Sequence, residues 1–198
     1  MSEVDEGELR TLQQAGDSNA ATAAAVRAYG DDVFSFLVSR LRDEDVAADV
    51  FSQALEDLLK SLPTFQWRCS MRTWFYRLGR SAAARYQRSP AHRADRRVAI
   101  SKASELVAQV RSRTSLHQRS EVKDRLRELR EELDADDQQL LVLRVENNLA
   151  WSEIAQIVDD EDEPAAIERA SARLRQQFQK IKVKLRDRAI AEGLFPAE

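Results

Sequence analysis

Residues 65–77 hold the combination of side chains that points most directly to a ligand. Aromatic rings, amides and guanidinium groups alternate through this segment, from Phe65 to Arg77. Proteins hold single-stranded DNA by stacking its bases on rings and by following its backbone with arginines. The segment therefore predicts single-stranded DNA binding, with Trp67 in contact with DNA or with a neighbouring loop. Trp74 occupies a position that also serves a core, and we expect it to be mainly structural.

A short apolar helix followed by a long basic one is predicted near the C-terminus. The short helix is expected over 149–158, with Ile154 and Ile157 facing inward and small Ala155 where another helix crosses closely. This is the layout of a helix-turn-helix, whose second helix enters the major groove and contacts bases and phosphates. A plain helical bundle with a basic surface is the alternative. The candidate DNA contacts are Arg169, Arg173, Arg175, Gln176, Gln179 and Lys180.

A third candidate surface lies on the helix predicted over 44–62. Its apolar residues form one stripe, and polar residues three or four apart form a ridge on the opposite face. The ridge is expected to face solvent or a partner. It consists of Asp49, Gln53, Glu56, Asp57 and Lys60.

The sequence offers binding surfaces rather than a catalytic centre. It has no phosphate-cradling Gly-rich loop and no nucleophile beside a base. One cysteine, Cys69, and two His provide neither an internal disulfide nor metal-ligand spacing. No apolar run approaches the roughly 18 residues of a membrane helix, and the acidic N-terminus does not resemble a secretion signal. We therefore expect a cytoplasmic protein that is not an enzyme, with no cofactor, no metal and no membrane partner.

Charge is arranged in blocks along the chain. Residues 1–63 hold 5 basic and 13 acidic side chains, 64–130 hold 17 and 5, 131–163 hold 1 and 12, and 164–198 hold 8 and 4. The two basic blocks are candidate polyanion-binding surfaces, and the acidic blocks are available to other partners. Each block is alternatively a solvated helix face.

The elements that must position these residues are all predicted to be helices. Four helices form a domain over 1–88: Gly16 and Asp17 separate the first two, Pro63 ends the third, and Ser70 caps the fourth. A basic linker is expected over 89–120, partly helical at 98–111. The fold class is therefore all-α, with two small helical domains joined by that linker.

The second predicted domain, 121–198, contains the helix-turn-helix. Asp134 is expected to cap a helix over 136–146, Asn147 and Asn148 to form a left-handed turn, and Pro164 to open the final helix, which runs to about residue 191.

The order of these motifs resembles the extracytoplasmic-function (ECF) sigma factors. The promoter-melting domain of that family is similar to the Gly16-Asp17 turn, residues 29–33, 48–53 and 70–74 with Phe65, and its helix-turn-helix domain is similar to 133–155. The matches cover about four fifths of the chain in the family's order. The resemblance implies a factor that binds core RNA polymerase and directs it to promoters.

The resemblance also implies roles for individual residues. Asp49 and Gln53, with Glu56 and Asp57 beside them, match positions that dock on the polymerase clamp helices. The loop from Gln66 through Trp67 and Arg68 to Ser70 matches the segment that captures a flipped base of the −10 single strand. The helix surface that meets this strand and the adjacent duplex is matched by Arg72, Arg77, Arg80, Ser81 and Arg85. The final helix is expected to read the −35 duplex, the linker to thread the polymerase toward the RNA exit path, and an anti-sigma factor to cover the polar surfaces.

Two features depart from the family pattern. Acidic residues 159–163 lengthen a turn that is usually short, which leaves the register of the last helix open. We expect this insert to tune −35 recognition or to exclude DNA until polymerase is bound. Ala150 replaces the usual hydroxyl cap before Trp151, at a cost of about 1 kcal/mol unless another group substitutes.

Two other functions stay open. A stand-alone helix-turn-helix regulator would bind its own operator as a dimer, but it leaves the segment 65–85 and the polar ridge unused. A degenerate sigma-like interaction protein would have lost −35 binding through its acidic insert.

Overall fold

The computed structural model describes residues 6–88, 110 and 132–191 of the 198. Within these ranges every element is a helix, so the predicted all-α class is confirmed. The chain divides into two compact units, Met1–Ser115 and Leu116–Glu198. Apart from residue 110, the predicted linker over 89–120, its helical part at 98–111 and the beginning of the second domain lie outside the described residues.

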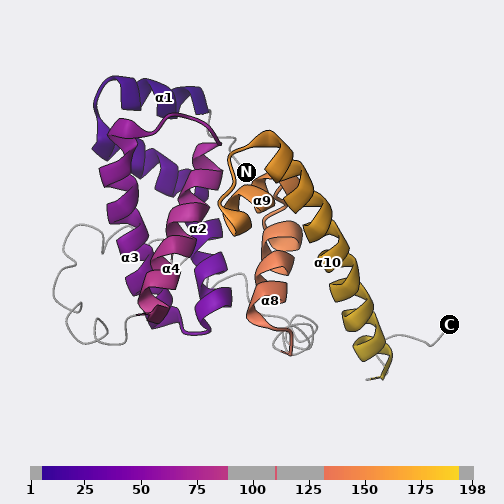
Figure 1. The fold of residues 1–198 in the computed structure, drawn as a ribbon. Coiled ribbons are helices and arrows are strands. Elements are labelled where there is room, and N and C mark those ends of the chain that lie inside the picture. The colour runs from indigo at the N-terminus through magenta and orange to yellow at the C-terminus, as the bar shows by residue number, and fades with distance from the viewer. Residues whose placement is uncertain (1–5, 89–109, 111–131, 192–198) are drawn as a thin grey trace. The chain divides into compact units, whose positions relative to one another are not determined.

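The first unit is a bundle of α-helices (Figure 1). Its elements are α1 (Glu6–Gln14), α2 (Ser18–Leu41), α3 (Glu44–Ser61), the short 3-10 turn η1 (Leu62–Thr64) and α4 (Met71–Arg88). Gly16 makes the predicted break with a left-handed backbone (φ 75°). Pro63 lies in η1, directly after the end of α3.

Side-chain caps begin three of these helices. Asp17 accepts a hydrogen bond from the Ala20 amide at 2.9 Å, and Asp43 accepts one from Val46 at 3.0 Å. Ser70 Oγ accepts from the Thr73 amide at 3.0 Å, which confirms Ser70 as the cap of α4. Each cap satisfies one of the amides that a helix N-terminus leaves without an intrahelical partner.

Aromatic rings join the three long helices in the core. Phe51 on α3 packs against Phe34 on α2 and Phe75 on α4, both with ring centroids 5.7 Å apart. Phe36 packs edge-on against Tyr76 at 5.4 Å. All five rings are fully buried. This burial fixes which face of α3 and which face of α4 remain outside.

One buried residue comes from beyond α4. Val110 is 0% exposed, and its Cγ2 would lie 3.2 Å from a Cβ atom built on Gly30 of α2. Gly30 therefore leaves the space into which Val110 packs. The first compact unit thus includes a residue from the range in which the linker was predicted.

The second unit contains α8 (Ala135–Leu141), the π-helical turn η3 (Val142–Glu146), α9 (Trp151–Asp159) and α10 (Pro164–Ala191). Asp134 caps α8 by accepting from the Asp137 amide at 2.8 Å, as predicted. The helix predicted over 136–146 changes type partway, because the α-helix ends at Leu141 and the next five residues are π-helical.

The turns of this unit partly differ from the predictions. Asn148 is left-handed (φ 50°), whereas Asn147 has φ −94°, so one asparagine rather than two makes the turn. Pro164 opens α10 as predicted. Ala150 occupies the N-cap of α9, where Glu153 accepts from the Ala150 amide at 2.8 Å. This carboxylate supplies half of a capping box, and the methyl group of Ala150 supplies no acceptor for the other half.

The core of the second unit is aliphatic. Leu143, Leu149, Ile154, Ala155 and Ile157 are buried, together with Leu174 and Ile181 of α10. The predicted inward positions of the short helix are therefore confirmed. Across the described residues, no helix is long and apolar enough to span a bilayer.

Candidate nucleic-acid interface

The loop between η1 and α4 presents two of its predicted DNA contacts to solvent. Gln66 and Arg68 are exposed. Trp67 between them is half-buried and has a left-handed backbone (φ 57°). Its ring lies 5.0 Å from Phe65, and the guanidinium of Arg10 lies 4.6 Å from its ring centroid. Of the two predicted environments for Trp67, the structure shows it packed against protein.

Residues of α1 bind this loop and the beginning of α4. Gln13 Oε1 accepts a hydrogen bond from Trp67 Nε1 at 2.5 Å, and Gln13 Nε2 donates to the carbonyl oxygens of Leu62 and Phe65. Glu6 Oε1 accepts from the Met71 amide at 2.9 Å. The first turn of α4 is thus capped from two sides, by Ser70 and by Glu6.

Trp74 is tied into the same region. Its ring stacks on Phe65 with centroids 5.4 Å apart, and its Nε1 donates to Ser61 Oγ at 3.2 Å. The guanidinium of Arg77 lies 5.5 Å from the Trp74 ring centroid. These contacts agree with the mainly structural role expected for Trp74.

Two of the α4 arginines predicted to meet DNA are paired with acids on neighbouring helices. Arg72 Nη2 lies 3.2 Å from Asp32 Oδ2 of α2, and Arg85 is ion-paired with Asp57 of α3. Arg80 is half-buried. Because these acids offset part of the positive charge, the attraction of α4 for phosphates is weaker than its arginine content alone indicates.

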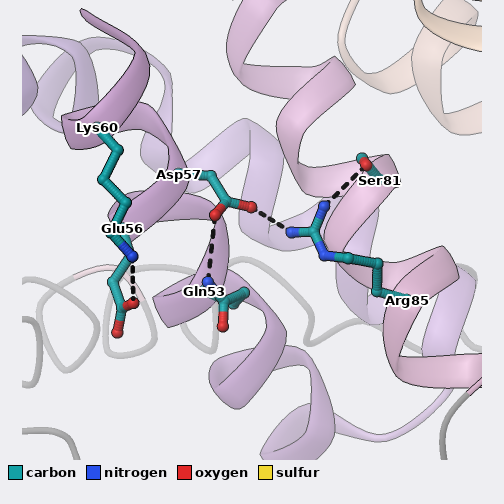
Figure 2. Close-up of polar contacts among 6 residues, drawn as sticks. All are labelled: Gln53, Glu56, Asp57, Lys60, Ser81 and Arg85. Atoms are coloured by element: carbon teal, nitrogen blue, oxygen red, sulfur yellow. Dashed lines mark hydrogen bonds and ion pairs between the residues drawn. The ribbon is translucent and has the colours of Figure 1, made fainter.

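The polar ridge of α3 is connected to α4 (Figure 2). Asp57 accepts a hydrogen bond from Gln53 Nε2 at 3.2 Å and holds Arg85, whose Nη1 donates to Ser81 Oγ at 2.9 Å. Glu56 pairs with Lys60 at 3.3 Å one turn along the same helix. Asp49, Gln53 and Asp57 are half-buried and Glu56 is exposed. Two predicted polymerase contacts, Gln53 and Asp57, and two predicted −10 contacts, Ser81 and Arg85, therefore meet in one hydrogen-bonded chain.

The predicted −35 contacts share the outer side of α10. All six are exposed: Arg169, Arg173, Arg175, Gln176, Gln179 and Lys180. Leu174 and Ile181 on the opposite side are buried, so packing orients the basic side outward. Trp151 of α9 contacts Phe178 of α10 edge-on at 5.5 Å.

The acidic insert interacts directly with this surface. Arg173 Nη2 donates to both carboxylate oxygens of Asp159, at 2.8 and 2.7 Å. Asp160 ends α9 with a left-handed backbone (φ 58°), and Glu163 accepts from the Ala166 amide at 2.7 Å in the first turn of α10. The insert therefore builds the turn between α9 and α10 and also neutralises one candidate DNA contact.

The sequence did not reveal the contribution of α1. Gln13 and Trp67 are 54 positions apart, and Glu6 and Met71 are 65 apart. Helical periodicity carries no information on such pairs. In the described ranges, no group of three or more His, Cys, Asp or Glu side chains is placed to hold a metal ion.

Part of the chain matches a known protein family. Residues 25–93 match the family model described as Sigma-70 region 2, which covers about a third of the chain. The match begins within α2 and includes all of α3, the loop and α4. Among curated proteins and solved structures, no significant match to the chain was found. The helices that carry the loop and the polar ridge are thus similar to Sigma-70 region 2, which supports a place for this chain in the sigma-factor family.

Proposed function

We propose that the protein is a transcription initiation factor of the ECF sigma type. It binds core RNA polymerase and directs promoter recognition and DNA melting. The observation that carries the proposal is the Sigma-70 region 2 match over residues 25–93. Catalysis belongs to the polymerase, and the factor contributes binding surfaces in the cytoplasm. The division into 1–88, a linker over 89–120 and 121–198 belongs to the same proposal.

The polar face of α3 is the proposed polymerase-binding surface. Its apolar stripe, including Val50, Phe51 and Leu58, is buried against α2 and α4, which turns the polar side of the helix outward. The residues proposed to contact the clamp helices are Asp49, Gln53, Glu56 and Asp57. The acidic charge of this face suits a basic partner.

The loop and α4 are the proposed binding surface for the −10 single strand. Exposed Gln66 and Arg68 provide hydrogen-bond donors and acceptors for a base edge, and the arginines of α4 provide charge for the backbone. Arg72 and Arg85 reach phosphates by exchanging a carboxylate partner for a phosphate, at small cost because each pair is partly exposed.

The pair α9 and α10 is the proposed −35 reader. Four residues separate the two helices, and the exposed polar side of α10 presents the six candidate contacts. In a helix-turn-helix such a second helix enters the major groove. An anti-sigma factor is the expected inhibitory partner, and its binding sites are proposed to overlap the polar surfaces of both units.

The test is formation of a complex with core RNA polymerase from a bacterium. Purified protein and core enzyme are run on size exclusion, alongside an Asp49→Ala, Gln53→Ala double variant. A matched control, Glu8→Ala with Gln14→Ala, removes one acid and one amide from exposed positions of α1. We expect co-elution of the wild type and of the control, and loss of co-elution in the α3 variant.

The opposite outcome would overturn the proposal. If the folded wild type fails to co-elute while the same core enzyme binds another sigma factor, the chain is not a sigma factor. An operator-binding regulator then becomes the leading function. Circular dichroism of the α3 variant excludes unfolding as the reason for any loss.

A further inference from the structure

Helix α1 contacts the loop over residues 65–70 and the beginning of α4. Figure 1 shows α1 across the end of the bundle where this loop leads into α4. The contacts come from Glu6, Arg10 and Gln13, spaced along one side of the helix. The matched Sigma-70 region 2 segment starts at residue 25, beyond α1.

Gln13 makes three hydrogen bonds to this part of the chain. Its Nε2 donates to the Leu62 carbonyl at 2.6 Å and to the Phe65 carbonyl at 2.9 Å, while its Oε1 accepts from Trp67 Nε1 at 2.5 Å. A primary amide is the side-chain group that offers two N–H donors and an acceptor in one plane. Gln13 is half-buried, so water competes weakly for these bonds.

The loop backbone that Gln13 contacts has an unusual conformation at Trp67. A left-handed backbone is uncommon for a residue as bulky as Trp67, whose φ is 57°. Such a conformation persists where surrounding contacts enforce it. Here the indole is held by the Gln13 hydrogen bond, the Arg10 guanidinium and the Phe65 ring. With the Trp67 side chain directed to α1, its neighbours Gln66 and Arg68 are exposed.

We propose that α1 sets the shape of this loop, and that Gln13 is a positioning residue for base recognition by Gln66 and Arg68. The inference rests on the proposed function, because it takes the exposed side of the loop as a DNA contact. Gln13 acts through Trp67 and the backbone of the loop, and does not itself touch DNA.

The proposal predicts that base discrimination depends on the rigidity of the loop. A rigid loop can reject the wrong base, because the wrong base leaves its polar groups without partners. A mobile loop can adapt to any base and loses that discrimination. Removing the Gln13 contacts is therefore expected to reduce preference among bases more than it reduces total DNA affinity.

The first measurement uses Cys69, the single cysteine of the chain, as a reporter in the loop. The rate at which a disulfide reagent modifies this half-buried thiol is compared in wild type, Gln13→Leu and Glu8→Ala. The Gln13→Leu variant removes the amide, and Glu8→Ala is an exposed α1 control. We expect several-fold faster modification in Gln13→Leu alone, measured at a temperature at which circular dichroism shows both variants to be folded.

The second measurement is base discrimination in the complex with core RNA polymerase. A preferred single strand is selected from a randomised DNA pool by the wild-type complex, and each of its positions is then varied. At the position that Gln66→Ala also affects, we expect Gln13→Leu to reduce a roughly ten-fold preference among bases to near none. The other positions and the polymerase complex should be unchanged.

The outcomes separate this inference from the proposed function. Wild-type discrimination that survives intact in Gln13→Leu overturns the inference, whether or not Cys69 reacts faster. A wild type that binds no polymerase overturns the proposed function and the base-recognition role together. A Cys69 modification rate that is the same in Gln13→Leu as in the wild type overturns the positioning role by itself. If Gln13→Leu does not fold, Trp67→Phe, which replaces the indole by a smaller ring that cannot donate to Gln13, decides in the same two assays.

Discussion

Arg173, a proposed −35 contact, is already bound to an acid of the adjacent turn. Its guanidinium is bound to both oxygens of Asp159, and the two side chains are 54% and 28% exposed. An ion pair this exposed contributes at most about 1 kcal/mol. A DNA phosphate or a guanine edge can therefore displace Asp159. If α10 binds DNA as proposed, Asp159 competes with the DNA for Arg173, which refines the role expected for the acidic insert.

Asp159→Asn is expected to raise the affinity of the isolated protein for DNA. Removing the competing charge should strengthen binding by up to about five-fold, equivalent to about 1 kcal/mol. The measurement is fluorescence anisotropy with a mixed-sequence duplex at low salt. The effect should shrink as salt is raised, because phosphate contacts release counterions.

Glu161→Gln is the matched control for this prediction. It removes one negative charge from the same turn without touching the Arg173 pair. An equal gain from both variants would show that general repulsion, rather than competition for Arg173, limits binding. Replacing the whole of residues 159–163 is a less specific experiment, because it also removes the Asp160 turn and the Glu163 cap of α10.

At the scale of the elements, α4 is held to its neighbours by its own proposed DNA contacts. Arg72 is ion-paired with Asp32 of α2, and Arg85 with Asp57 of α3. On the buried side of α4, Phe75 and Tyr76 pack against rings of α3 and α2. The apolar core sets the distance between helices, and the ion pairs connect their outer edges. Because Asp57 also accepts from Gln53, a partner that takes Asp57 or Gln53 would change the surroundings of Arg85.

A double-mutant cycle measures the link between α3 and α4. We expect Asp57→Asn and Arg85→Gln to show a coupling free energy of about 0.5–1 kcal/mol in urea unfolding, the range for a partly exposed pair. High salt should reduce the coupling. The cycle of Glu56→Gln and Lys60→Gln, a more exposed pair within α3, should give about 0.3 kcal/mol. Coupling in the first cycle no larger than in the second would contradict the link.

At the scale of the whole molecule, the first compact unit extends beyond α4. Val110 is buried beside Gly30, and a Cβ atom at Gly30 would also lie 3.1 Å from Val26 Cγ1 and 3.6 Å from Phe51 Cζ. The glycine thus provides a close approach between α2 and a residue 80 positions later. A change of this contact therefore alters the packing of Val110 on the bundle.

Gly30→Ala tests that contact. Within a helix the substitution by itself favours folding by about 0.5–1 kcal/mol, but here the new methyl group meets both Val26 and Val110. We expect Gly30→Ala to destabilise the wild type and to be less destabilising in a Val110→Ala background, where the contact with Val26 remains. The two effects should differ by at least about 0.5 kcal/mol in denaturant unfolding. Equal effects in both backgrounds would mean that Val110 does not pack on Gly30.

The sequence by itself determined the helical class and most of the local structure of this protein. The caps at Asp134 and Ser70, the break at Gly16 and the opening of α10 at Pro164 were all readable, because each depends on residues within about four positions. The buried stripe of α3 followed from helical periodicity in the same way. Leu59, which the same periodicity placed in the stripe, is an exception because it is 38% exposed.

Only the tertiary structure decided how the candidate sites are arranged. It placed Gln13 beneath the loop, paired Arg72 and Arg85 with acids, and turned Trp67 toward α1. Sequence patterns assign a residue to a face of its own helix, but they do not say which side chain of another helix it meets. The sequence therefore predicted the candidate surfaces, and the packing of the helices determined which of their side chains are exposed and which are bound to other parts of the protein.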